Sequence, residues 1–373
     1  MATDSGRPGV PADAGPSVGN VPRGFVTVRG SDFALHGRRF RFGGTNNYYL
    51  HYKGRYMADC VLHDAAAIGL RVIRCWGFLD GTPADGVVLQ PEPFTYDEDG
   101  FEYLDYTVFK AGQLGLRLVI VLTNNWGDFG GIPQYANWFS AEHDDFFRRR
   151  DIKDCYKAWV KHVINRRNRY TGVRYDSEPT VMTWELANEP RCPSDRSGNT
   201  LVTWVDEMSR HVKRLAPRQL VAVGDEGFYG RSGDTQYPYS DNEGVAWNRL
   251  ISLPTIDYGT FHLYQQHWGE ENPAWGTRWI RDHIRDAHAA NKPAVLEEFG
   301  WQADAATRDK VYAAWTDAVE RFDGDGDHFW ILTSRNEDGT HYADYDGLRV
   351  VHPSSTALLL AAHAGRMSPP NVR

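Results

Sequence analysis

Eight short runs rich in apolar and β-branched residues alternate with longer amphipathic stretches along this chain. The runs have the length of β-strands, and the stretches between them have the length and periodicity of helices. The predicted strands are residues 39–44, 71–76, 117–123, 181–186, 220–223, 258–263, 294–299 and 328–333. The predicted helices are residues 58–69, 103–115, 151–170, 201–216, 275–291, 305–322 and 353–364. Because strands that alternate with helices form parallel sheets, the pattern predicts the α/β class and a (β/α)8 TIM barrel.

The alternation is not interrupted by a Pro- or Ser-rich linker, so we expect a single domain over residues 23–366. Residues 1–22 are rich in Gly, Pro, Ala and Ser and lack the apolar segment of a signal peptide, which indicates a flexible N-terminal arm. Residues 367–373 are expected to form a C-terminal tail. The crossover after the fifth strand shows no clear helix.

Composition and charge exclude several kinds of partner. Lys and Arg number 41 against 49 Asp and Glu, so a basic field that would attract nucleic acid is missing. No apolar run approaches the roughly 18 residues of a membrane span, so we expect no membrane partner. The 13 Trp, 19 Tyr and 17 Phe suit a carbohydrate cleft, because aromatic faces stack on sugar rings.

Neither the cysteines nor the histidines have the spacing of a metal site. Cys60, Cys75, Cys155 and Cys192 form no CxxC pair and are few for this length, which favours small buried residues over a disulfide framework. The histidines form no HExxH motif or other cluster with metal spacing. We therefore expect no metal and no cofactor.

Polar and aromatic residues collect where the predicted strands end, which is where the loops of a TIM barrel carry catalytic groups. Such regular charged strand ends would be costly in a core, because a buried unpaired charge is unfavourable. These residues are Arg74, Trp76, Asn124, Asn125, Trp126, Asn188, Glu189, Asp225, Glu226, His262, Tyr264, Glu297, Glu298 and Trp330. By contrast, Trp159, Trp204 and Trp315 lie within predicted helices and are expected in the core.

Two strand ends carry acidic motifs: Asn188-Glu189-Pro190 after the fourth strand, and Glu298 followed by an aromatic residue and Gly after the seventh. With the longer segments around them, these motifs resemble glycoside hydrolase family 5, and within it the endo-β-1,4-mannanase branch (subfamily 7-like). The segments are TNNWGDFGG (123–131), WELANEPRC (184–192), GDEGFYG (224–230), FHLYQQHWG (261–269) and DGTHYADYDG (338–347). The resemblance extends from about residue 23 to residue 364.

The resemblance implies that Glu189 and Glu298 are the catalytic carboxyls. A retaining glycosidase needs one acid that protonates the leaving oxygen and one carboxylate, about 5 to 5.5 Å away, that attacks the anomeric carbon. Two negative charges at that separation repel by about 3 kcal/mol at an effective dielectric near 20. Ionisation of both carboxyls near neutral pH is therefore unfavourable. By the family pattern, Arg74 and Tyr264 would hold Glu298 ionised as the nucleophile and leave Glu189 protonated as the acid.

Two alternatives to this assignment stay open. Glu189 and Glu298 could be ordinary rim carboxylates in ion pairs, and the adjacent Glu297 is a rival nucleophile. Because side chains alternate along a strand, Glu297 and Glu298 should face opposite sides. The family pattern places the nucleophile directly before the aromatic residue and Gly, so we assign Glu298.

The resemblance also implies supporting residues around the bond that is cut. Asn188 matches the residue that hydrogen-bonds the sugar 2-hydroxyl, and His262 with Tyr264 matches the polar pair at the cleavage subsite. Trp330 matches the platform beneath the reacting sugar. For His262 and Trp330, an ordinary core role is the alternative.

Four further matches are substrate-binding positions at a greater distance. Trp126 and Trp268 match stacking positions, Glu226 matches a ligand of a sugar hydroxyl, and Arg191 matches a contact on the leaving-group side. Plain surface or packing roles are the alternative for each.

The sequence therefore predicts a retaining endo-β-1,4-mannanase that hydrolyses internal bonds of mannan, glucomannan or galactomannan. Its expected partners are β-mannan polysaccharides and manno-oligosaccharides, and the protein is expected to be a monomer. Another retaining β-glycanase, an exo-acting mannosidase and a non-catalytic sugar-binding barrel are the alternatives. Because a polymer does not cross membranes, we expect the enzyme to be secreted, although no signal peptide is visible.

Overall fold

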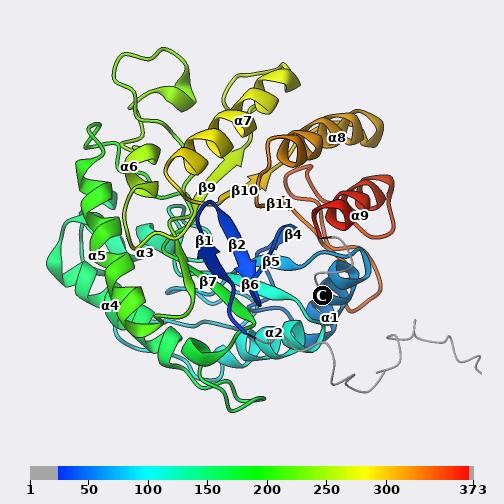
Figure 1. Ribbon diagram of the computed structural model, residues 1–373. Helices are drawn as coiled ribbons and strands as arrows, with labels where there is room; N and C mark the ends of the chain where they lie inside the picture. The colour runs from blue at the N-terminus through cyan, green and yellow to red at the C-terminus, as the bar shows by residue number, and fades with distance from the viewer. Residues whose placement is uncertain (1–23, 369–373) are drawn as a thin grey trace, which may run out of the picture.

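Eight parallel strands form the centre of the computed structural model, which describes residues 24–368 (Figure 1). Their order is β8-β7-β6-β5-β4-β11-β10-β9. Between β8 and β9 the barrel closes through backbone hydrogen bonds from Asp257 to Val221 (2.9 Å) and from His262 to Glu226 (3.2 Å). The strands are β4 (Phe42–Asn47), β5 (Val72–Trp76), β6 (Arg117–Val121), β7 (Val181–Glu185), β8 (Leu220–Ala222), β9 (Gly259–Leu263), β10 (Ala294–Phe299) and β11 (Gly326–Phe329). The predicted (β/α)8 TIM barrel is confirmed.

Helices surround this barrel, as the ring of coiled ribbons in Figure 1 shows. They are α1 (Arg55–Ala67), α2 (Phe101–Gln113), α3 (Gly131–Trp138), α4 (Arg150–Asn165), α5 (Asn199–Leu215), α6 (Trp247–Ile251), α7 (Pro273–Ala289), α8 (Ala305–Arg321) and α9 (Ser355–Met367). Three short 3-10 helices, η1 (His143–Phe147), η2 (Tyr175–Ser177) and η3 (Tyr237–Tyr239), lie in the connections. The unclear fifth crossover contains α6, which has only five residues.

The first and eighth strands differ most from the prediction. β4 begins and ends three residues later than expected, because its glycines and asparagines have low strand propensity and hide its C-terminal half. β11 begins two residues earlier and ends at Phe329, so the apolar residues that follow belong to a loop. The helix α3 was not predicted.

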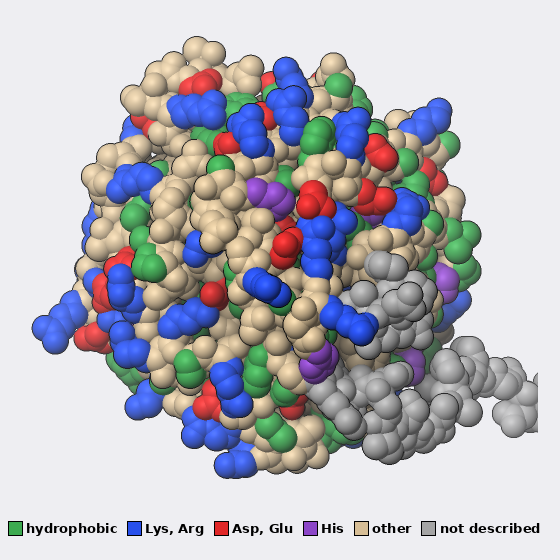
Figure 2. All heavy atoms as spheres, in the orientation of Figure 1, with side chains coloured by type: hydrophobic (Ala, Val, Ile, Leu, Met, Phe, Trp, Pro, Cys, Tyr) green, Lys and Arg blue, Asp and Glu red, His purple; other side chains and the backbone are tan. Residues whose placement is uncertain are grey.

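A small antiparallel sheet, also absent from the prediction, covers the end of the barrel at which the strands begin. It consists of β1 (Thr27–Arg29), β2 (Asp32–Leu35) and β3 (Arg38–Arg39), and it lies in front of the barrel in Figure 1. Phe33 and Phe40 pack in one apolar cluster with Val72 and Leu220, the first residues of β5 and β8. On the face that this sheet covers, Lys and Arg are scattered among Asp and Glu (Figure 2).

The barrel wall is buried on both sides, as expected for parallel strands covered by helices. Every residue of β5, β6 and β7 is buried. Trp159, Trp204 and Trp315 are also buried, so their predicted place in the core is confirmed. All four cysteines are free thiols.

No helix within residues 24–368 is both long enough and apolar enough to cross a membrane. The predicted arm over residues 1–22 and most of the predicted tail lie outside the described residues.

A buried histidine connects the last helix to the barrel. His363 of α9 contacts Glu320 of α8 through Nδ1 and Asp327 of β11 through Nε2, each at 2.6 Å. Burial alone would lower the pKa of His363, but the two carboxylates raise it above the usual value. His363 is therefore a cation that joins two elements near the end of the chain.

This contact makes stability depend on pH. Because the pKa of His363 is raised by folding, its contribution is complete below the unfolded value of about 6.5 and is lost as pH rises through the folded value. We expect His363→Gln to lower the free energy of unfolding by about 3 kcal/mol at pH 5.5, with a smaller difference at pH 9. Urea unfolding of both proteins at the two pH values measures this. A difference that does not change with pH would contradict it.

Candidate active site

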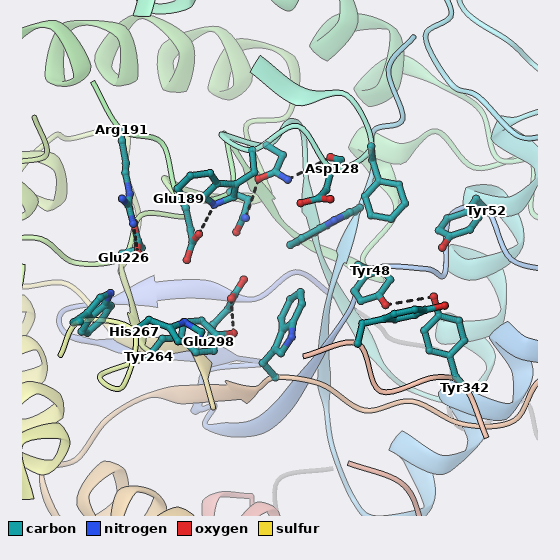
Figure 3. Close-up of a pocket in the computed structure, with 18 of the residues that line it drawn as sticks. Tyr48, Tyr52, Asp128, Glu189, Arg191, Glu226, Tyr264, His267, Glu298 and Tyr342 are labelled. Atoms are coloured by element: carbon teal, nitrogen blue, oxygen red, sulfur yellow. Dashed lines mark hydrogen bonds and ion pairs between the residues drawn. The ribbon is translucent and has the colours of Figure 1, made fainter. Parts of the chain in front are cut away.

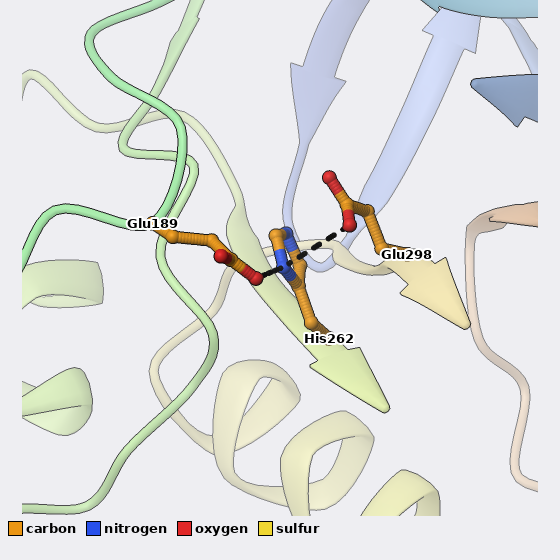
Figure 4. A group of neighbouring side chains, drawn as sticks. All are labelled: Glu189, His262 and Glu298. Carbon is orange, nitrogen blue, oxygen red and sulfur yellow. Dashed lines mark hydrogen bonds and ion pairs between the residues drawn. The ribbon is translucent and has the colours of Figure 1, made fainter. Parts of the chain in front are cut away.

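Two acidic side chains and a histidine meet at the end of the barrel opposite the small sheet. Glu189 lies in the loop after β7, His262 on β9 and Glu298 on β10 (Figure 4). One carboxylate oxygen of Glu189, one of Glu298 and a ring nitrogen of His262 all lie within 4.8 Å of one another. The two carboxyls are thus close to the separation of about 5 to 5.5 Å that retaining hydrolysis of a glycoside requires.

The backbone around Glu189 is held in an uncommon conformation. Glu189 has a φ of 49°, in the left-handed region that few residues other than Gly adopt. Its N–H donates to the carbonyl of Gly224 at 2.7 Å. A Cβ on Gly224, whose φ is 88°, would lie 2.2 Å from a carboxylate oxygen of Glu185, so only Gly allows this approach. The loop after β7 therefore turns the Glu189 side chain into the cleft.

Arg74 of β5 organises the site from beneath. Its Nε and Nη2 donate to the two carboxylate oxygens of Glu185 at 2.8 and 2.5 Å, and Nη1 donates to Glu298 at 2.5 Å. The remaining N–H groups reach Asn46 at 3.1 Å and Asn188 at 2.7 Å. All five donors of this completely buried guanidinium are thus used.

Glu298 receives a second donor from Tyr264, whose hydroxyl lies 2.8 Å from Oε2. The predicted support of Glu298 by Arg74 and Tyr264 is therefore present as direct contacts. Asn188, expected beside the sugar 2-hydroxyl, lines the cleft while its amide nitrogen donates to Asn124 at 3.0 Å.

A β-bulge decides between the two adjacent glutamates. In the register of β10 against β9, Leu296 pairs with Phe261 and Glu298 pairs with His262, so Glu297 is the extra residue. The expectation that the two side chains face opposite sides is wrong, because Glu297 also points into the barrel, 3.8 Å from His262 Nε2. Glu298 lines the cleft, whereas Glu297 is sealed below it. The geometry favours Glu298 as the nucleophile.

The protonation of Glu189 depends on its neighbours. Burial would raise the pKa of Glu189, but hydrogen bonds from His262 (2.8 Å) and from the Trp126 indole (2.6 Å) lower it to about 2. Burial would lower the pKa of His262, but Glu298 and Glu189 raise it well above the usual value. Burial raises the pKa of Glu298, and His262 and Arg74 offset only part of this. These shifts favour an ionised Glu189 beside a protonated His262 in the free site, and the assignment of Glu189 as the acid stays a prediction.

A cleft of about 890 Å³ extends on both sides of the two carboxyls (Figure 3). Trp330 lines it beside Tyr48, with ring centroids 5.9 Å apart, and its indole N–H donates to Asp346 at 2.6 Å. Fixed by these contacts, the half-buried Trp330 ring provides the flat apolar surface expected of a platform.

The other predicted binding residues lie at the opposite end of the cleft, where Figure 3 places Arg191 and Glu226. Arg191 forms a bidentate ion pair with Glu226 at 2.7 and 2.8 Å, and its guanidinium lies 4.9 Å from the Trp126 ring. Trp268 packs edge-on against Phe228. Trp126 was expected at an outer stacking position, but its hydrogen bond to Glu189 places it beside the acid.

Sequence reasoning missed an aromatic wall at the Trp330 end. Five of its side chains line the cleft: Tyr48, Tyr52, Phe129, Tyr342 and Tyr345. Tyr342 and Tyr345 belong to the segment DGTHYADYDG, which was recognised only as part of the resemblance. Glu185 and Asn46 were missed too, although a glutamate inside an otherwise apolar strand was a usable signal.

Glu189, His262 and Glu298 are also the one group of three within residues 24–368 whose ligand atoms are close enough to hold a metal ion. Each of the three already pairs within the protein: Glu298 with Arg74 and Tyr264, and Glu189 with His262. The three side chains thus have partners within the protein, and the absence of a metal stays a prediction.

Comparison with known proteins agrees with this geometry. A family model described as "GH family 5 beta-mannosidase-like" matches residues 23–323. Mannan endo-1,4-beta-mannosidase 1 of Arabidopsis thaliana is 34% identical over 378 residues, which cover 93% of this chain and 91% of that protein.

Solved structures show the same likeness. The endo-beta-1,4-mannanase from Thermotoga petrophila is 46% identical with a TM-score of 0.84, covering 90% of this chain and 79% of that one. The endo-1,4-beta-mannanase from Rhizomucor miehei is 33% identical with a TM-score of 0.86, covering 92% of this chain and 99% of that one.

The contacts of Arg74 predict that lysine cannot replace it. A lysine ammonium lacks the planar fork and would leave Glu185 or Glu298 without its donor. We expect Arg74→Lys to lower the free energy of unfolding by about 3 to 5 kcal/mol, as when a buried ion pair is broken. Arg285→Lys, at an exposed surface ion pair, is the control and should change it by less than about 0.5 kcal/mol. Equal effects of the two substitutions in denaturant unfolding would refute this role.

Proposed function

Because the chain belongs to glycoside hydrolase family 5, we propose that it is a retaining endo-β-1,4-mannanase. The observation that carries this proposal is the approach of Glu189 and Glu298 to within 4.8 Å across one cleft. At this separation the second carboxylate reaches the anomeric carbon directly and leaves no space for a water between them. Hydrolysis then proceeds through a covalent glycosyl-enzyme and retains the configuration of the sugar.

In the first step Glu298 is the nucleophile. Its carboxylate attacks the anomeric carbon while the glycosidic oxygen takes a proton from Glu189. Arg74 and Tyr264 hold the attacking carboxylate in one orientation, so little reorganisation is needed when the bond forms. The amide of Asn188, fixed by Arg74, presents a polar group to the reacting sugar.

The proton for that step comes from the pair formed by His262 and Glu189. His262 Nδ1 lies 2.8 Å from Glu189 Oε1, so the proton first passes across this hydrogen bond to Glu189, and the protonated Glu189 then gives it to the leaving oxygen. In the second step a water attacks the glycosyl-enzyme, and Glu189 accepts its proton as a general base. In the free site the hydrogen bonds from His262 and Trp126 lower the pKa of Glu189, so its carboxylate is ionised.

Cleavage inside the polymer is supported by the place of the carboxyls within the cleft. Glu298 lies between the end marked by Tyr52 and Tyr342 and the end marked by Arg191 and Glu226 (Figure 3). Sugar units therefore find side chains on both sides of the bond that is cut. The names of the related proteins from A. thaliana, T. petrophila and R. miehei support a β-1,4-mannan as the polymer.

We further propose that the enzyme is secreted, because mannan is a polymer that does not enter cells intact. We also propose that it works as a monomer.

The roles of the two glutamates predict opposite products with azide. Glu189→Ala should lower hydrolysis of mannan about 100- to 10,000-fold, the usual value of a general acid. A dinitrophenyl β-mannobioside needs no proton for departure, so azide should accelerate this variant and give the β-azide. Glu298→Ala should instead give the α-azide, because azide replaces the nucleophile. Nuclear magnetic resonance of the products decides, and exchanged products would reverse the assignment.

The proposed substrate and mode of cleavage predict how a polymer solution changes. We expect reducing ends to be released from linear mannan and glucomannan and not from carboxymethylcellulose. The viscosity of a galactomannan solution should fall well before reducing ends accumulate, since internal cuts shorten chains fastest. Release of single mannose units at nearly constant viscosity would indicate an exo-acting mannosidase, and greater activity on carboxymethylcellulose would indicate an endoglucanase.

A further inference from the structure

Glu297 is a completely buried glutamate that the proposed reaction does not use. Neither of its carboxyl oxygens has a hydrogen-bond partner among residues 24–368. A buried carboxyl without partners is costly, so a residue of this kind at the bulge beside the nucleophile calls for a chemical reason.

The position of Glu297 relative to His262 provides that reason. Glu297 Oε2 lies 3.8 Å from His262 Nε2, and Glu189 Oε1 lies 2.8 Å from Nδ1 on the other side of the ring. The imidazole therefore lies between a carboxyl below the cleft and the acid within it, and Figure 4 shows its ring between Glu189 and Glu298. Because His262 Nε2 also has no hydrogen-bond partner among the described residues, Glu297 is the acidic group facing that atom.

Other titratable groups also act on His262 or Glu297. Asp225 and Glu226 after β8, Glu298 on β10 and His328 on β11 interact with His262, and burial lowers the pKa of His328 well below its usual value. Arg74 on β5 and Glu185 on β7 interact with Glu297. Arg74 Nε is also 3.8 Å from Glu297 Oε2, and the guanidinium is already bound to Glu185 and Glu298.

We propose that Glu297 is a positioning residue for the acid step. Its charge acts on the His262 imidazolium and thereby decides whether the proton of His262 can pass to Glu189. The proposal deepens the function proposed above and rests on it. While Glu297 is neutral, the imidazolium is stabilised mainly by Glu189 and Glu298, and the proton can pass to Glu189 when the leaving oxygen requires it. When Glu297 ionises, its charge at 3.8 Å stabilises the imidazolium further and retains the proton on His262.

The environment of Glu297 fits this role. Burial and the nearby Glu185 raise the pKa of Glu297 to about 8, against the opposing effects of Arg74 and His262. Glu297 is thus neutral where the acid step must operate and becomes charged on the alkaline side. The alkaline limb of the activity profile should therefore contain the ionisation of this carboxyl.

The test compares the wild-type enzyme with Glu297→Gln, which keeps the shape of the side chain but cannot ionise. The pH dependence of kcat/KM on mannan reports groups of the free enzyme. We expect the alkaline limb to move upward by at least half a pH unit, the acid limb to stay in place, and activity at the optimum to change by less than tenfold. An unchanged alkaline limb would overturn the proposal.

Asp225→Asn is the matched comparison, because Asp225 is also buried near His262 and has a pKa raised to about 7. We expect it to move the alkaline limb less than Glu297→Gln does. If only Asp225→Asn moves the limb, Asp225 and not Glu297 sets the protonation of His262, and the proposal fails.

A second measurement does not need substrate. The His262 resonance in 13C-histidine-labelled protein, assigned by its loss in His262→Gln, reports the imidazole directly. Glu297→Gln should lower the pKa of His262 by at least one unit, and no change would overturn the proposal. Should that variant not fold, wild-type His262 should show a second, smaller chemical-shift step near pH 8, and its absence would overturn the proposal equally. If this coupling is found in a protein that does not cleave mannan, the proposed function fails and the coupling stands.

Discussion

The buried Arg74 guanidinium is the interaction on which the site depends. A guanidinium inside a barrel is tolerated only when its charge and all of its donors are matched. Here the matching groups come from different elements: Asn46 from β4, Glu185 from β7, Asn188 from the following loop and Glu298 from β10. The contacts that stabilise this buried cation also fix Glu298 and the amide of Asn188 in place. The site is therefore positioned when the barrel folds.

The second cation, His262, completes the charge balance. The imidazolium and Arg74 together face three carboxylates of Glu185, Glu189 and Glu298, and further ionisation in the same space is unfavourable. Burial, together with the nearby Glu185, therefore raises the pKa of Glu297. Glu297 is the fourth carboxyl in this region, and the two cations, Arg74 and His262, are already paired with the other three.

Much of this arrangement could be predicted from the sequence, for a definite reason. In a parallel barrel, strand ends converge on one rim, so Arg74, Glu189, His262 and Glu298 could be placed together from their positions alone. The motifs around the glutamates and the family resemblance then assigned roles. The rim of the barrel that holds these residues can therefore be predicted from local strand patterns.

What could not be predicted depends on contacts between distant segments. The bulge at Glu297 is a property of pairing between β10 and its neighbours, and simple alternation gave the wrong side for that residue. The raised pKa of His262 depends in part on a 2.8 Å contact to Glu189, in a loop 73 residues away in the chain. The small sheet and the bounds of β4 were missed because glycines and short strands give weak local patterns.

The neighbours of Glu189 show which of its protonation states the free site stabilises. Trp126 donates to one oxygen and His262 to the other, and Arg191 lies against the Trp126 ring, so every one of these contacts stabilises the carboxylate. A site built in this way holds Glu189 in its ionised form before substrate binds. Protonation of the leaving oxygen must then draw on the imidazolium, whose proton is one hydrogen bond away. In the proposal made above, the acid strength of Glu189 therefore depends on Glu297, which lies on the other side of the His262 ring, below the cleft.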